Sequence, residues 1–264
     1  MNPRRVPVGY GKPVMSERPS VPGDDDPDSD GTAGESRVNA HQARNDRAAW
    51  GIPSQAESRW PAVAAVIVAI ALQVVLPNVL IQGLGPRWLV PVLESILLIA
   101  LIITNPTRAD REGSALRWLS VSLIALITAA NMLVLGELIH ALLEHSGTPG
   151  RNLVYASVPI WLTNVIAFTL WYWELDRGGV AARLQPQHRE PDFLFPQMGT
   201  PGSSPGWTPK FIDYLYTSFT NATAFSPTDT MPLTGWAKLL MMVQSMASLL
   251  TVALVVSRAV SILA

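Results

Sequence analysis

The chain has 264 residues, of which 19 are Lys or Arg and 20 are Asp or Glu, so its formal net charge is −1. This balance gives no indication of a nucleic-acid partner. The absence of cysteine excludes disulfides, thiolate metal sites and cysteine nucleophiles.

Residues 1–59 form a polar segment with 8 Lys/Arg and 9 Asp/Glu and almost no large apolar side chains. Such a composition buries too little apolar area to offset the entropy of ordering, and the acidic run at 24–30 repels itself. No apolar core follows the early arginines, as a signal peptide would require. We therefore expect a disordered, solvated tail, which is also the candidate site for a protein partner.

Residues 60–264 hold nearly all the Leu, Ile, Val and Trp and are expected to form one all-α domain in a lipid bilayer. A helix needs about 20 residues to cross about 30 Å of hydrocarbon. Tryptophans lie at the ends of the apolar stretches, where an aromatic belt meets the membrane interface. The sequence predicts five spans, at residues 61–81, 88–104, 118–141, 153–173 and 236–263.

The distribution of arginine predicts the orientation of these spans. The tail, the loop at 105–117 and the loop at 175–207 carry most of the arginines outside the spans. By the positive-inside rule these segments are cytoplasmic, which places the N-terminus inside a multi-pass protein of the cell membrane.

A polar, aromatic segment precedes the last span, at residues 211–226. Asp213, Thr217, Thr220 and Asn221 cluster on one side of its helical wheel. A free-standing helix of this polarity is a poor span. A half-helix that dips into the bundle is permitted where protein covers it or where it lines a cavity, and a short sixth span is the alternative.

The order of residues here is an Asp, then Tyr-x-x-Phe-Thr, then Thr followed six residues later by Asp, a Pro, and a last helix with Gln and Ser. It resembles the pore-helix, filter and inner-helix unit of two-span potassium channels. It is also similar to bacterial membrane proteins that carry a degenerate form of that unit. The resemblance covers 210–264 and implies that residues 211–223 correspond to the pore helix and Asp229 to the acid after the filter.

The filter itself does not carry over from the channels. Residues 223–229 read Thr-Ala-Phe-Ser-Pro-Thr-Asp, without the glycines that let a backbone direct its carbonyls at an ion. The usual route to potassium selectivity is therefore not expected. A channel pore loop also enters from outside, whereas the arginines place the 175–207 loop inside.

Other polar groups lie within the predicted spans. Glu94 is expected to titrate, to pair with Lys238 or Arg258, or to bond to a neighbouring helix. Gln244, Ser248 and Thr251 form a stripe that either joins helices or lines a water path. The candidate pore or pathway residues are Asp213, Thr217, Thr220, Thr223, Asp229, Gln244, Ser248 and Glu94.

Catalytic and metal-binding signatures are weak or absent. Glu137, His140 and Glu144 share a helix face, but a di-iron bundle needs two Glu-x-x-His motifs and further glutamates. No phosphate loop, nucleophile elbow or zinc-protease signature appears. We expect no metal, no cofactor and no enzymatic activity.

Three functions remain open. The first is a channel-like protein that passes ions or small solutes, for which several copies would be needed to enclose a path. The second is a membrane anchor or interaction protein without transport activity. The third is a small proton-coupled transporter that uses Glu94 and Asp213.

Overall fold

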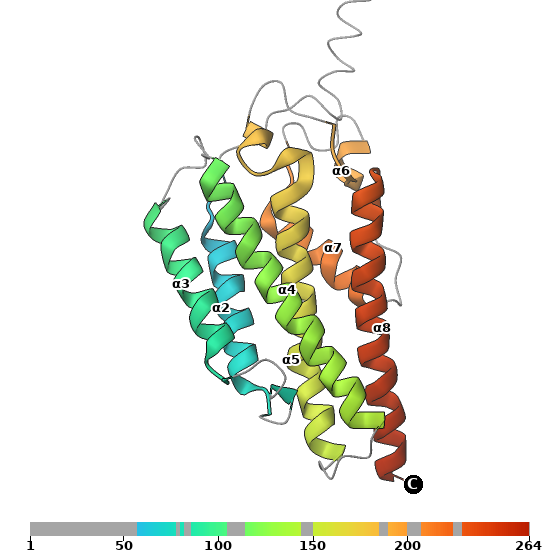
Figure 1. Ribbon diagram of the computed structural model, residues 1–264. Coiled ribbons are helices and arrows are strands. Elements are labelled where there is room, and N and C mark those ends of the chain that lie inside the picture. The colour runs from blue at the N-terminus through green and yellow to red at the C-terminus, as the bar shows by residue number, and fades with distance from the viewer. Residues whose placement is uncertain are drawn as a thin grey trace, which may run out of the picture. The chain divides into compact units, whose positions relative to one another are not determined.

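The computed structural model describes residues 57–77, 80–81, 86–104, 114–143, 150–184, 190–199, 207–223 and 229–263. The predicted disordered tail lies outside these residues, apart from its last three. The described chain is mostly helical (Figure 1). Its longer helices are α2 (Trp60–Val75), α3 (Leu89–Thr104), α4 (Ser114–Leu143), α5 (Gly150–Leu175), α7 (Phe211–Thr223) and α8 (Gly235–Leu263).

Among the described residues, three helices are long and apolar enough to cross a membrane, whereas five spans were predicted. They cover Ala115–Leu142, Val154–Gly178 and Gly235–Ser257, so each predicted span in α4, α5 and α8 has a helix of sufficient length. α2 and α3 have 16 residues each, which is about 24 Å at 1.5 Å per residue. By length they fall short of the hydrocarbon thickness.

The first predicted span is too long because of Pro77. The ring of a proline disfavours helical backbone at the residue before it. Leu76 accordingly has an extended conformation, with ψ of 143°, and α2 ends at Val75 instead of Ile81. The sequence pattern remains apolar through Ile81, which is why apolarity alone extends the helix by six residues.

α5 is the central helix of the bundle and packs against α2, α4, α7 and α8. α3 lies on the outer side of α2 and α4 (Figure 1). One buried cluster joins the aromatic side chains of α5, α7 and the loop after α5, with members such as Phe168, Tyr172, Trp173, Phe193 and Tyr214. A smaller cluster lies between α4, α5 and the end of α2.

The outer surfaces of the bundle are apolar and its interior is partly polar. α3 exposes Val92, Leu93, Ile96, Ile99 and Ile103. α8 exposes another apolar row, which is Leu239, Met242, Val243, Met246, Leu249, Leu250, Val256 and Val260. The side of α8 that faces the bundle instead buries Gln244, Ser248 and Thr251. A soluble protein rarely exposes such contiguous apolar surface, whereas lipid solvates it, so this distribution supports the expected membrane location.

The chain between α5 and α8 folds over one end of the bundle. It contains two short 3₁₀ turns, η4 (Asp176–Gly178) and η5 (Ala182–Leu184), and one short helix, α6 (Pro196–Gly199). Strand β1 (Phe193–Leu194) pairs antiparallel with β2 (Met231–Pro232), with Phe193 opposite Pro232. This pairing holds the start of α8 beside the end of α5.

Candidate functional site

The chain before the short helix α7 and the chain at Thr230 after it lie at the same end of the bundle. The side-chain oxygens of Thr217 and Thr230 lie 3.1 Å apart, so the chain that follows α7 returns beside its middle. From there β2 pairs with β1 and α8 begins. α7 packs against α5 and α8 and crosses them at an angle (Figure 1). Its 13 residues are fewer than the about 20 that a helical span needs.

The carboxyl end of α7 reaches deep into the bundle. Ser218 donates to the backbone carbonyl of Val165 at 2.7 Å, and Asn221 donates to the carbonyl of Met241 at 3.0 Å. Val165 is ten residues before the end of α5, roughly 15 Å along its axis. Val165 lies near the middle of α5, and Met241 lies six residues after the start of α8, so the second half of α7 is beside the middle of α5 and the first turns of α8.

A polar network centred on Gln244 joins α5, α7 and α8. The Gln244 amide donates to the Ser218 hydroxyl at 2.7 Å and to the Ser218 carbonyl at 2.9 Å. The Gln244 carbonyl oxygen accepts from Asn221 at 2.8 Å and from the Tyr172 hydroxyl. On the next turns, Asn164 donates to Ser248 at 2.8 Å. Every polar atom of Gln244 is thus used inside the chain.

Two predicted pathway residues belong to this network. Gln244 and Ser248 are fully buried and bond to neighbouring helices, which is the joining role that the sequence left beside the water-path alternative. Tyr172 belongs to the same network through its hydroxyl.

The hydroxyl groups of α7 bond mainly to their own helix. Thr217 donates to the carbonyl of Asp213, and Thr220 to the carbonyl of Tyr216, each at 2.9 Å. Thr223 donates to Thr220 at 2.8 Å and is half-buried at the carboxyl end. Asp213 accepts from the N–H of Lys210 at 2.7 Å and therefore caps the helix start.

Two predicted pathway residues lie away from the network. Asp229 is exposed in the return segment after α7. Glu94 lies on α3, where the side-chain amide of Gln73 in α2 donates to it at 3.0 Å. Glu94 thus bonds across the α2–α3 contact, and Lys238, one of its two expected partners, is exposed on α8. The side chain of Arg258, the other, lies outside the described residues.

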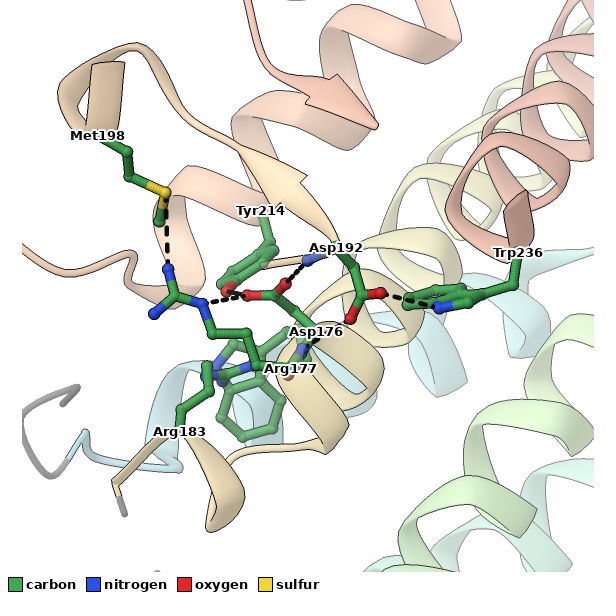
Figure 2. A network of polar contacts seen from close by, with 8 residues as sticks. Asp176, Arg177, Arg183, Asp192, Met198, Tyr214 and Trp236 are labelled. Carbon is green, nitrogen blue, oxygen red and sulfur yellow. Dashed lines mark hydrogen bonds and ion pairs between the residues drawn. The ribbon is translucent and has the colours of Figure 1, made fainter. Parts of the chain in front are cut away.

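A second network fixes the end of the bundle where α7 enters (Figure 2). Asp176, at the end of α5, accepts from the Tyr214 hydroxyl at 2.7 Å and from the N–H of Asp192 at 2.9 Å. The carboxylate of Asp192 accepts from the N–H of Arg177 at 2.8 Å and from the Trp236 ring at 3.0 Å. These acids therefore connect α5, the loop, α7 and α8.

Two buried arginines complete this second network. Arg177 lies 3.7 Å from the Asp176 carboxylate and has a positive φ of 54°, an unusual backbone conformation for a side chain of this size. Arg183 donates to the carbonyls of Trp173 and Asp176, and its guanidinium lies 5.4 Å from the centre of the Tyr214 ring. Burial raises the pKa of the Tyr214 phenol well above its usual value, so Tyr214 remains a hydrogen-bond donor to Asp176.

Sequence reasoning missed the acids that organise this end of the bundle. Asp176, Asp192 and Glu57 lie in segments that read as ordinary polar loop or tail. Glu57 accepts from the N–H of Phe211 at 2.6 Å and from the Trp173 ring at 3.1 Å. Acids that directly flank predicted spans, next to tryptophan, are the available signal, but that pattern also describes solvated helix ends.

The described residues contain no cluster of three or more His, Asp or Glu that could hold a metal ion. His140 is exposed on α4, and Glu144 lies outside the described residues. Comparisons with models of protein families, with curated proteins and with solved structures give no match to this chain.

Proposed function

We propose that the chain is a multi-pass membrane protein in which α2 and α3 also cross the bilayer, and that its copies assemble around a path for ions or small solutes. The path would pass the carboxyl end of α7. The observation that carries the proposal is the dipping geometry of α7, whose two ends lie at one end of the bundle and near its middle. Membrane proteins tolerate such half-helices where they are buried in protein or line a cavity.

The exposed face of α3 supports the inclusion of the shorter helices. Its outward side chains are as apolar as those of α8, and Trp88 lies beside its start, where an interfacial anchor is favoured. A short apolar helix is accommodated by local thinning of the bilayer at modest cost. Five crossings then remain the proposed arrangement.

A path between copies is favoured over a path through one copy. The polar groups between α5, α7 and α8 bond to one another, and Ser218, Gln244 and Ser248 are fully buried. The outward side of α7, with Tyr216 and Phe219, is exposed in the single chain. A helix carboxyl end carries partial negative charge, which favours a cation at the end of α7. In this arrangement α7 would take the place of the channel pore helix, although the chain lacks the channel filter.

The test uses the full chain reconstituted in liposomes, with fluxes of K⁺, Na⁺ and a small neutral solute measured separately. Because the chain has no cysteine, Thr223→Cys introduces one reactive thiol at the end of α7. A charged thiol reagent is expected to block flux in Thr223→Cys. It should leave flux unchanged in the cysteine-free chain and in Ala64→Cys, whose thiol would lie on the exposed side of α2.

Absence of any flux in the unmodified chain would reject the proposal. The anchor function then takes its place, and deletion of residues 1–58 should abolish binding of a protein partner. Flux that persists after modification of Thr223→Cys would reject only the position of the path.

A further inference from the structure

Glu94 is a carboxyl group buried between helices without a charged partner. Its exposed fraction is 0%, and the Gln73 amide donates to Oε1 at 3.0 Å. The second oxygen, Oε2, is buried and has no hydrogen-bond partner. An ionised carboxylate in this position would lose its hydration. The hydrogen bond from the neutral Gln73 amide would be its compensation.

The helices that pack against α3 offer no compensating cation among the described residues. α2 contains no ionisable residue, and Glu94 is the sole one in α3. α4 contributes Arg117, Glu137 and His140. The guanidinium of Arg117 lies at the opposite end of the bundle, beside the backbone of Gly179. Glu137 and His140 lie toward the carboxyl end of α4, and neither forms an ion pair with Glu94 in the described chain.

Among the side chains that the structure describes, Arg87 is the remaining cation at this end, and it contacts other groups. Its guanidinium donates to the backbone carbonyl of Val74 and lies 5.9 Å from the Trp88 ring centre. The buried acid is therefore left with Gln73 as its hydrogen-bonding neighbour. Burial of an unpaired charge is strongly unfavourable, so the neutral acid is the form that the site accepts.

A small cavity lies beside this site. Its lining includes Gln73, Val90, Pro91, Pro86 and Arg87. Val90 and Pro91 are four and three residues before Glu94, so they share its face of α3. The volume of about 20 Å³ is sufficient for a water molecule. Gln73 both lines the cavity and bonds to Glu94, so its side chain is the group that separates the Glu94 carboxyl from water in the cavity.

We propose that Glu94 is a proton-binding site that is occupied at neutral pH and exchanges its proton through this cavity. The geometry matches a neutral carboxylic acid: Oε1 acts as the carbonyl oxygen that accepts from Gln73, and Oε2 carries the proton. The site lies on α2 and α3, away from α7, and it does not depend on the proposed conduction path. A proton bound within the membrane domain is what coupling of a flux to pH requires.

Dicyclohexylcarbodiimide tests the protonation state, because this apolar reagent requires a protonated carboxyl group. The acid proton passes to a carbodiimide nitrogen, and the carboxylate oxygen bonds to the central carbon. The O-acylisourea that forms rearranges to a stable N-acylurea without a leaving group. Labelling of the full chain in liposomes is read by mass spectrometry of its peptides.

The expected result is a label on Glu94 at neutral pH that declines as the medium becomes alkaline, and loss of this label in Glu94→Gln. Glu137→Gln is the matched control, since it removes a half-buried acid of α4 and should leave the label on Glu94 unchanged. A water-soluble carbodiimide should not modify Glu94.

Infrared spectroscopy makes the test independent of reagent access. The carbonyl stretching band of a protonated acid should be present in the wild type at neutral pH and absent from Glu94→Gln. If both the band and the label are missing at neutral pH, Glu94 is ionised and the proposal is wrong. Protection from labelling by Na⁺ at constant pH would also overturn it, because a metal cation would then be the ligand.

Discussion

The side-chain carboxylate of Glu57 accepts a hydrogen bond from the backbone N–H of Phe211 at 2.6 Å, which joins the chain before α2 to the first residue of α7. The other carboxylate oxygen accepts from the ring nitrogen of Trp173 near the end of α5 at 3.1 Å. The first N–H groups of a helix have no partner within the helix, so Glu57 satisfies one of them from a distant segment. The dipping helix is thereby attached to two other elements at its start.

Replacement Glu57→Ala is expected to lower the free energy of unfolding by about 1 kcal/mol, the usual cost of losing a helix cap. The unfolding midpoint in detergent micelles should fall accordingly. Glu190→Ala is the control, because this exposed acid precedes β1 and should change the midpoint little. Equal midpoints for both variants would show that Glu57 does not hold α7.

Gln244 and Ser218 are expected to be energetically coupled across the α7–α8 contact. Gln244→Leu leaves the Tyr172 hydroxyl without its acceptor, removes one of the acceptors of the Asn221 amide, and should cost about 1–3 kcal/mol. Ser218→Ala removes one of the same bonds, so the double variant should lose less than the sum of the single variants. Unfolding free energies of the four proteins measure the coupling, and additive losses would contradict it.

The exposed apolar row of α8 supplies the control for these single and double variants. Met242→Leu changes a side chain of similar volume on the outward face and should be nearly neutral. A loss as large as that of Gln244→Leu would mean that the outward face, and not the polar network, dominates the stability of α8.

The sequence predicted the long helices because they depend on local composition. The apolar runs that become α4, α5 and α8 are long, and residues 211–223 form the helix α7, while 224–226 lie outside the described residues. The error in the first span arose from Pro77, whose effect on Leu76 is also local and could have been applied.

The polar networks required information that the sequence pattern does not contain. Gln244, Ser248 and Asn164 were visible as polar groups within spans, but whether they faced one another or water depended on helix rotation. Asp176 and Asp192 bond across the loop through distant partners such as Tyr214 and Trp236. Spacing along the chain does not report such contacts.

Asp176→Ala is expected to loosen the loop over the bundle end. The substitution removes the acceptor of the Tyr214 hydroxyl and of the Asp192 N–H, and it leaves Arg177 buried without its carboxylate. Limited proteolysis should then cleave the chain between residues 185 and 206 at least several-fold faster. Asp229→Ala, in an exposed position, is the control, and cleavage at wild-type rate would contradict the structural role of Asp176.

Stability should fall at alkaline pH through Tyr214. The phenol has a raised pKa in the folded chain. The stability that it contributes is therefore fully present below the pKa of the phenol in the unfolded chain, which is about 10. Above that pH the unfolded phenol ionises and the folded one does not, which favours unfolding by up to about 1.4 kcal/mol per pH unit. Tyr214→Phe should reduce this slope in denaturation measured from neutral to alkaline pH, whereas Tyr155→Phe, at an exposed site, should not.

The basic end of the bundle is expected to face the cytoplasm, so α7 would enter the membrane from inside. Arg59, Arg117, Arg177 and Arg183 all lie at this end of the described chain. Single cysteines at Ser36 and Ser204 in the cysteine-free chain should resist an impermeant maleimide in intact cells and react once the cells are opened. Ser146→Cys, between α4 and α5 at the other end, should react in intact cells and is the positive control. Labelling of Ser204→Cys without opening would place the loop outside, as in the channels that the segment 210–264 resembles, and would overturn the orientation derived from arginine.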